Sequence, residues 1–458
     1  MRRAIAIVKW LVTITVAALL AVIVWLWLAP PALIRVGSNY AAKIVCSNVF
    51  LAGRDEGSVL ADDVQAPGHP LLKLMRVHVN RENGIVEAGL LGFMGGGQAI
   101  YREGIGCTTV PAGSTVQPLR APERSVVSKV EFAASNDPAI QTLLENEVLG
   151  GRGIRAALVI HDGQIIAEHY GRGFNRDTPL LGWSMSKTVV ATLVGALVEE
   201  GRLSVGQANL FPEWASDGRA RITVADLLGM ESGLAFNENY GNVSDVTRML
   251  YLEPDMAAFA ASLPAEAEPG QRFSYSTGST MLLSRIWQNA FPDNSEALAW
   301  AYRTLFDPVG MKSAVLEVDA SGTSTGSSYI YATAGDWAHF ATLLLNNGIA
   351  EGRRILPEDW VEWMRTPTKV SRGEYGRHVW LHGPRRGGDG NGDPDAGFNL
   401  PPDAYWMIGH DGQTITIIPS RRLIVLRMGL TPSSVGYKPQ ALVAEVVREL
   451  DRSSPVAE

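Results

Sequence analysis

The chain has 458 residues, of which 46% are hydrophobic and 19% are charged, and its formal net charge is -7. This length and apolar content allow a sizeable core and more than one module, whereas the acidic balance with scattered Lys and Arg excludes an electrostatic nucleic-acid binder. No internal repeat is visible, and no low-complexity tract occurs beyond short Gly- and Pro-rich loops.

The first predicted element is an apolar helix near the N-terminus. Trp10 to Ala29 carry no charge and would span about 30 Å as a helix, which is the thickness of a bilayer's hydrocarbon core. Arg2, Arg3 and Lys9 precede this run, so the positive-inside rule predicts a cytoplasmic N-terminus. A cleaved signal peptide is the alternative, but its apolar region is normally only about 7 to 15 residues long. We therefore predict an uncleaved signal anchor over residues 1–30, which crosses the cell inner membrane once and leaves the rest of the chain in the periplasm.

The region that follows, residues 31–135, is predicted to be a small extracytoplasmic accessory domain rich in β-structure. Strand and turn patterns recur at Arg76–Asn80, around a Gly95–Gly97 loop and at Ser125–Phe132. The sequence assigns this region no chemistry.

The only two cysteines, Cys46 and Cys107, both lie in this exported region. Oxidising compartments permit disulfides, so we predict that the two cysteines pair. Two free buried thiols are the alternative, because nothing in the sequence measures their separation.

The pattern changes in residues 136–458, which we predict to form one larger domain. An amphipathic helix at Ala139–Val148 is followed by two apolar strands around His161-Asp162-Gly163, where Asp-Gly is typical of a hairpin turn. The middle is mostly helical. Further strands are expected at 404–408, 414–418 and 423–428, before a last helix at 439–450. This order predicts an α/β fold of the α+β type, in which both ends of the domain complete one antiparallel sheet with helices on both faces.

Ser184-Met185-Ser186-Lys187 is the first stretch that indicates chemistry. A Ser-x-x-Lys step on a helix places a hydroxyl and an amine one turn apart, and the apolar run Thr188–Val198 predicts a buried helix that begins near Ser184. The first N–H groups of a helix lack partners, so the Ser184 N–H is a candidate oxyanion donor. Burial opposes a charged amine, which makes Lys187 a candidate base for a Ser184 nucleophile. In isolation, the motif would more often be an N-capping serine and a surface lysine.

Four further stretches accompany this motif. They are Ile222–Gly233, Pro269–Thr277, Leu305–Met311 and Gly409–Gln413. In this order, they resemble the serine beta-lactamase and penicillin-binding-protein superfamily over about residues 137 to 452. Within it, the sequence is similar to the class-C-like hydrolases that include esterases and 6-aminohexanoate-dimer hydrolases. The resemblance implies a beta-lactamase-like antiparallel sheet with a mostly helical insertion, and a serine hydrolase that needs no cofactor and no metal.

The resemblance implies a second catalytic element, a Tyr-x-Asn step. The matching position is Tyr275-Ser276-Thr277, where threonine replaces asparagine and a family contact to the acyl group is in doubt. A protonated amine favours a neighbouring phenolate, so we expect Tyr275 and Lys187 to share one proton as a coupled pair. Either group would then remove the proton from Ser184.

The third element of lactamases is Lys-Thr-Gly, and its counterpart here is Met407-Ile408-Gly409. Because the lysine helps receive a substrate carboxylate, Met407 argues against penicillins and for a neutral ester or amide. Gly409 would let the backbone approach the substrate, and the second oxyanion donor would be the His410 N–H or Gln413. Tyr240 resembles a tyrosine with which aminohexanoate-dimer hydrolases hold the substrate amide, although a packing role is equally compatible.

The sequence near the third element contains two further features that bear on the site. We reject a triad of His410 with Asp411, because neighbouring side chains on a tight turn are expected to point apart. The loop from His382 to Pro402 either shapes the pocket or is a solvated linker.

The sequence therefore predicts a membrane-anchored, extracytoplasmic serine hydrolase that cleaves a small ester or amide through a Ser184 acyl-enzyme. The alternatives are a D,D-peptidase, a beta-lactamase, or a catalytically silent relative that binds cell-wall peptide or a partner protein. Joint presence of Ser184, Lys187 and Tyr275 favours an enzyme.

Overall fold

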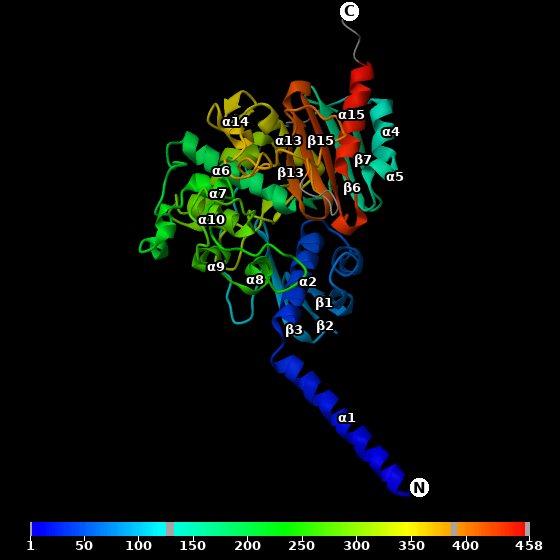
Figure 1. Cartoon of the computed structure of the whole chain (residues 1–458). Coiled ribbons are helices and arrows are strands. Elements are labelled where there is room, and N and C mark those ends of the chain that lie inside the picture. Colours follow the sequence, from blue (N-terminus) through cyan, green and yellow to red (C-terminus); the bar gives the residue numbers. More distant parts are fainter. Residues whose placement is uncertain (1, 125–131, 386–391, 454–458) are drawn as a thin grey trace, which may run out of the picture.

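Figure 1 shows the computed structural model, which describes residues 2–124, 132–385 and 392–453. Helix α1 (Arg2–Leu28) stands away from the folded body, and most of its described side chains are exposed. Ile5–Leu28 is the single stretch among the described residues that is long and apolar enough to cross a bilayer, a test that signal sequences also pass. The predicted apolar helix is therefore confirmed.

The next segment packs one helix against a small antiparallel sheet. Helix α2 (Ala32–Phe50) contacts all four strands of this sheet, which lie in the order β1-β2-β3-β4. The strands are β1 (Met75–Asn80), β2 (Ile85–Leu90), β3 (Met94–Arg102) and β4 (Gly106–Thr109). Short helical turns connect α2 to β1, namely α3 (Glu56–Val59), η1 (Leu60–Gln65) and η2 (Pro70–Leu74).

This segment confirms one expected strand and corrects two expectations. The strand at Arg76–Asn80 is present, but residues 32–50 form a helix and the glycines 95–97 lie inside β3. A Cβ atom on Gly95 or Gly97 would lie 2.2 Å from atoms of Ser38, so these glycines allow α2 to approach the strand closely. Most of the strand expected at Ser125–Phe132 lies outside the described residues.

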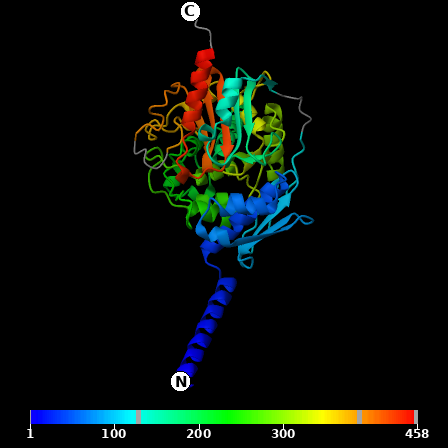
Figure 2. The same cartoon turned by 90° about the vertical axis from the view of Figure 1, so that its right-hand side faces the viewer.

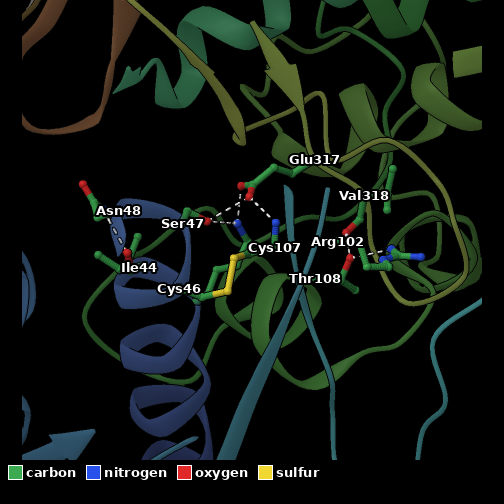
Figure 3. Close-up of a disulfide and its surroundings, with 10 residues drawn as sticks. Ile44, Cys46, Ser47, Asn48, Arg102, Cys107, Thr108, Glu317 and Val318 are labelled. Carbon is green, nitrogen blue, oxygen red and sulfur yellow. Dashed lines mark hydrogen bonds and ion pairs between the residues drawn. A yellow bond between two sulfur atoms is a disulfide. The ribbon is translucent and has the colours of Figure 1, made fainter. Parts of the chain in front are cut away.

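The segment is joined to the rest of the body by a shared core and by buried polar contacts (Figure 3). The disulfide Cys46–Cys107 links α2 to β4 with Cα atoms 6.1 Å apart, which confirms the predicted pairing. Beside it, Lys43 forms a buried ion pair with Glu317, whose carboxylate also accepts hydrogen bonds from Ser47 Oγ at 2.9 Å and the Cys107 N–H at 2.6 Å. Removing one partner of such a pair would leave a buried charge uncompensated.

The larger sheet has six strands in the order β13-β14-β15-β6-β7-β5. Both ends of the larger region contribute to it, and every neighbouring pair is antiparallel except β5 and β7. The expected beta-lactamase-like sheet is therefore confirmed. The strands are β5 (Ala133–Ala134), β6 (Ile154–His161), β7 (Gln164–Tyr170), β13 (Tyr405–Gly409), β14 (Gln413–Ile418) and β15 (Leu423–Gly429).

Helices cover both faces of this sheet (Figures 1 and 2). On one face, α4 (Pro138–Glu145) and α15 (Pro439–Ser453) pack together and bury Ile140 and Leu442 against the strands. On the other face, α13 (Ala334–Leu345) contacts β6, β14 and β15. The apolar side chains of the strands are thus buried on both sides.

A mostly helical insertion separates β7 from β13, as predicted. Its helix α6 (Ser186–Glu199) is buried along nearly its whole length and packs against α10 (Thr277–Gln288). The other helices with regular α-structure are α5 (Glu147–Gly150), which precedes the insertion, and α7 (Val224–Leu228), α8 (Asp245–Leu252), α9 (Met256–Ser262), α11 (Asn294–Ala301), α12 (Asp307–Val309) and α14 (Trp360–Arg365). Small sheets are formed by β8 (Leu180–Leu181), β10 (Ile330–Ala332) and β9 (Val315–Leu316), and by β11 (Ile349–Ala350) and β12 (Arg353–Arg354).

Candidate active site

Ser184 lies in a short 3-10 turn, Trp183–Met185, that leads directly into α6. The residue before it, Trp183, has a φ of 48°, in the left-handed region that bulky side chains rarely adopt. Such backbone strain persists only where the surrounding structure imposes it, and it is common at functional turns. The Ser184 side chain is half-buried, so its hydroxyl is held at a defined place and remains accessible.

Lys187 lies one turn further along α6 and is buried, with 1% of its surface exposed. Its ammonium nitrogen is 3.1 Å from Ser184 Oγ, 3.2 Å from Thr277 Oγ1 and 2.9 Å from the Ser327 carbonyl oxygen. Burial lowers the pKa of Lys187 to about 8, and the Glu238 carboxylate opposes that shift. The predicted one-turn contact is present, and a substantial fraction of the amine is neutral near pH 8.

Tyr275 lies just before α10 and shares a hydrogen bond with Ser184. The nitrogen of Lys187 is 5.1 Å from the centre of its ring, so the amine faces the ring. Burial, with a smaller contribution from Glu238, raises the pKa of Tyr275 well above its usual value. The expected shared proton with a phenolate is therefore wrong: the tyrosine keeps its proton at neutral pH.

Glu238, which no sequence motif indicates, lies beside these groups in the structure. One carboxylate oxygen accepts a hydrogen bond from the Thr277 N–H at 2.8 Å, and the other accepts one from Thr277 Oγ1. Thr277 Oγ1 in turn accepts from Lys187, so a chain of hydrogen bonds runs from the amine to the carboxylate. Threonine at the position of the family asparagine thus connects a buried carboxylate to the candidate base.

Tyr240 and His410 meet at the entrance to this site. Their ring centres are 5.1 Å apart, and the His410 ring is 5.5 Å from that of Trp183. The imidazole Nε2 also lies 3.5 Å from an oxygen of Asp411, so the expectation that these two side chains point apart is wrong. Asp411 adopts a positive φ of 55°, which turns its side chain back toward its neighbour.

Gly409 ends β13 next to the turn that carries Ser184. A Cβ atom at this position would lie 2.4 Å from the Gly182 carbonyl oxygen, so glycine permits the close approach of the strand to the turn. The buried amide of Gln413 donates to the carbonyl oxygen of His410 at 2.9 Å and to that of Gly429. The Gln413 side chain is therefore committed to the backbone, which leaves the His410 N–H as the candidate second oxyanion donor.

Comparison with known families decides the membership of the chain. Residues 144–439, well over half of the sequence, match the family model described as Beta-lactamase. The chain belongs to the beta-lactamase family. The predicted superfamily is thereby confirmed, and with it the class of activity, that of a serine hydrolase.

Individual members of the family show how far the similarity extends. The chain is 26% identical over 290 residues to 6-aminohexanoate-dimer hydrolase of Paenarthrobacter ureafaciens, covering 57% of this chain and 71% of that protein. A Bacillus anthracis structure provisionally assigned as a 6-aminohexanoate-dimer hydrolase matches with a TM-score of 0.58 at 19% identity, over 74% of this chain and 90% of that one. The structure of a family VIII carboxylesterase matches with a TM-score of 0.52 at 17% identity, over 70% of this chain and 100% of that one. These two structures show the shared fold.

A cavity of about 380 Å³ lies beside β13 of the family fold, and we call it the Trp380 cavity. Ile408 and Gly409 line it from the strand, His410 lines it from the turn that follows, and Phe273 and Trp380 line it from the insertion. The Trp380 ring is also 5.2 Å from the ring of Tyr275. Described parts of the loop from His382 to Pro402 form one wall, which supports the reading that this loop shapes the pocket.

Among the described residues, one group of three could offer ligands to a metal ion, namely His382, Asp393 and Asp395. The imidazole Nδ1 lies 3.1 Å from a carboxylate oxygen of Asp393 and 3.4 Å from one of Asp395. A hydrogen bond with Asp395 raises the pKa of His382, which favours the imidazolium. The contacts of His382 with Asp393 and Asp395 brace the loop.

Proposed function

We propose that the protein hydrolyses a neutral carboxylic ester or amide through an acyl-enzyme on Ser184. The contact that carries this proposal is the 3.1 Å separation between Ser184 Oγ and the nitrogen of Lys187, a buried amine whose pKa is lowered to about 8. An amine that is partly neutral and within hydrogen-bond distance of a hydroxyl is suited to activate it as a nucleophile.

In the acylation step, Lys187 accepts the hydroxyl proton while Ser184 Oγ attacks the substrate carbonyl carbon. The resulting oxyanion accepts hydrogen bonds from the N–H groups of Ser184 and His410. Tyr275, whose raised pKa keeps it protonated until this point, donates its proton to the leaving oxygen or nitrogen as the bond between that atom and the carbonyl carbon breaks. The Lys187 ammonium then returns a proton to Tyr275, and a water molecule repeats the sequence on the acyl-enzyme.

The third element supports a neutral substrate. Met407 is buried in β13 with 1% of its surface exposed, at the position where the resemblance places the lactamase lysine. An apolar side chain cannot neutralise a substrate carboxylate, and a charge without a partner is costly to bury. This observation favours a neutral ester or amide as the substrate over a penicillin or a peptide with a free carboxylate.

An activity-based probe tests the nucleophile directly. We expect a fluorophosphonate to label the purified full-length protein, and we expect the Ser184→Ala variant to remain unlabelled, because the probe requires an activated hydroxyl. The matched control is Ser186→Ala, which removes a buried hydroxyl two residues away and should leave labelling unchanged. Mass spectrometry of the labelled peptide gives the modified residue.

Two results would contradict this function. A probe attached to another serine would show that Ser184 is not the nucleophile. Complete absence of labelling in a folded protein would favour the catalytically silent relative that binds cell-wall peptide or a partner.

We also propose that α1 anchors the protein in the cell inner membrane, with residues from Pro31 onward in the periplasm. Ile5–Leu28 is long enough to span a bilayer, and the basic residues precede it. The disulfide Cys46–Cys107 is consistent with an oxidising compartment.

A protease added to intact spheroplasts tests this topology. We expect the hydrolase region to be digested from outside, and the protein to fractionate with membranes until detergent is added. A cytoplasmic protein that resists the protease until lysis serves as the control. Protection of the hydrolase region in intact spheroplasts would contradict the orientation, and a soluble form trimmed after the apolar run would contradict the anchor.

A further inference from the structure

A second cavity, of about 340 Å³, lies between the N-terminal segment and the candidate active site, and we call it the Leu71 cavity. From the N-terminal segment, it is lined by Leu33 and Val36 of α2 and by Leu71 and Met75. From the hydrolase region, Trp183 and Tyr240 line it. Residues outside the beta-lactamase match therefore form much of its wall.

The chemistry of this wall selects an uncharged, apolar occupant. Its N-terminal side is mostly aliphatic, and its other side combines aromatic rings with small polar side chains, namely Asn242, Thr247, Ser433 and Ser434. Among the described residues that line the cavity, no Lys or Arg occurs, and Asp411 is the only carboxylate. An anion would find no cationic partner there, whereas an alkyl chain would gain the free energy of leaving water.

The Leu71 cavity adjoins the catalytic groups through two of its lining residues. Trp183 is the residue next to Ser184, and Tyr240 forms a side-chain hydrogen bond with Thr277, the partner of Lys187. His410 lines both this cavity and the Trp380 cavity, so the two cavities adjoin at this residue.

The position of Tyr275 indicates which part of the substrate enters each cavity. Its ring lies 5.2 Å from the ring of Trp380, a wall of the Trp380 cavity. As the proton donor, Tyr275 must contact the leaving group, which therefore lies toward the Trp380 cavity. The acyl group lies on the other side of the carbonyl carbon and therefore extends into the Leu71 cavity.

We propose that the N-terminal segment supplies an acyl-chain pocket, and that the substrate is an ester or amide of an apolar acyl group. This inference rests on the proposed function of Ser184. Leu33 lies in the first turn of α2, shortly after α1 ends at Leu28, so an anchored protein would hold the cavity close to the bilayer surface. Acyl compounds that partition into lipid are concentrated at that surface.

The test uses the full chain in lipid nanodiscs and p-nitrophenyl esters from acetate to octanoate. We expect kcat/KM to rise about two- to fourfold for each added methylene until the cavity is filled. In the Leu71→Trp variant, the ratio of octanoate to acetate kcat/KM should fall by about tenfold or more, because the indole occupies the pocket. The matched control is Leu74→Trp, on a side chain in the same turn that is 44% exposed and does not line the cavity.

Further variants and substrates distinguish a failure of this proposal from a folding defect and from a failure of the proposed function. Leu71→Ala enlarges the pocket and should move the preferred ester to a longer chain. A series of p-nitrophenyl esters that is flat in acyl length, yet hydrolysed by Ser184, would overturn the pocket and leave the proposed function intact. A rise in rate only with alkyl acetates of increasing alcohol length would place the chain on the leaving-group side and overturn the assignment. Failure to hydrolyse any ester in a Ser184-dependent way would overturn the proposed function and this inference with it.

Discussion

The Ser184→Ala, Lys187→Ala and Tyr275→Phe variants should each lose about a thousandfold or more in kcat/KM for a short-chain alkyl ester, whose alkoxide leaving group needs a proton. Ser184→Ala removes the attacking oxygen, Lys187→Ala removes the group that accepts its proton, and Tyr275→Phe removes the donor to the leaving group. Steady-state kinetics on purified, folded variants measures each loss. The residual rate should approach what substrate binding and oxyanion stabilisation alone provide.

Combining these substitutions should add little to the first loss. Because the three groups act together in acylation and the loss of any one already disables it, the double and triple variants should resemble the worst single variant. His410→Ala is the comparison, since truncating its side chain leaves the proposed backbone donor in place and should cost far less. Retained activity in Ser184→Ala would contradict a covalent mechanism. A loss in folded His410→Ala as large as that in Ser184→Ala would instead show that the imidazole takes part in the chemistry.

The large sheet was predictable because local sequence patterns identify its strands. The strands β6 and β7 are apolar runs joined at Asp162-Gly163, and the C-terminal runs have the length and composition of buried strands. The helix α2 was missed for the opposite reason. It buries polar side chains such as Asn39, Lys43 and Ser47, whose partners Tyr251 and Glu317 are more than 200 residues away. No local pattern reveals contacts of that kind.

The candidate site likewise contains some contacts that the sequence predicts and others that depend on the tertiary fold. Ser184 and Lys187 are one turn apart on a helix, so their contact follows from the spacing. Glu238 was missed because it is positioned by hydrogen bonds to Thr277, from a loop whose path depends on the tertiary fold. The proton on Tyr275 was misjudged because burial, rather than a nearby cation, dominates its pKa. A sequence shows which groups lie near one another on an element more readily than how deeply they are buried.

The N-terminal segment shows what family membership leaves open. The family match begins at residue 144, yet α2 shares the hydrophobic core of the hydrolase region and lines a cavity at its entrance. The disulfide links α2 to β4 within this segment, and the buried pair of Lys43 with Glu317 joins the segment to the hydrolase region. The segment is therefore positioned to determine specificity, while the residues proposed for the chemistry lie within the family match.

The acid limb of the pH profile should report the protonation of Lys187. Its pKa is about 8, and Tyr275 stays protonated through the neutral range, so the neutral amine is the form that activates Ser184. His378, which is also buried nearby, has a pKa lowered to about 3 and stays neutral throughout. We expect kcat/KM to fall by about fiftyfold between pH 8 and pH 6, as the amine becomes protonated. A flat profile over this range would contradict Lys187 as the base.

Replacing Glu238 tests whether this carboxylate controls the base. Burial raises the pKa of Glu238, and the neighbouring Lys187 opposes that rise. The ionised carboxylate raises the pKa of Lys187, so the uncharged Glu238→Gln variant should have a lower Lys187 pKa and an acid limb at lower pH. At pH 6, the neutral fraction of the amine would then increase, although lost hydrogen bonds to Thr277 reduce the maximal rate. The control is Glu266→Gln, which removes a surface carboxylate paired with Arg272 and should leave the midpoint unchanged. If Glu238 serves only to hold Thr277, the maximal rate would fall while the midpoint stays where it is, and a midpoint that moves to higher pH would contradict its electrostatic effect on Lys187.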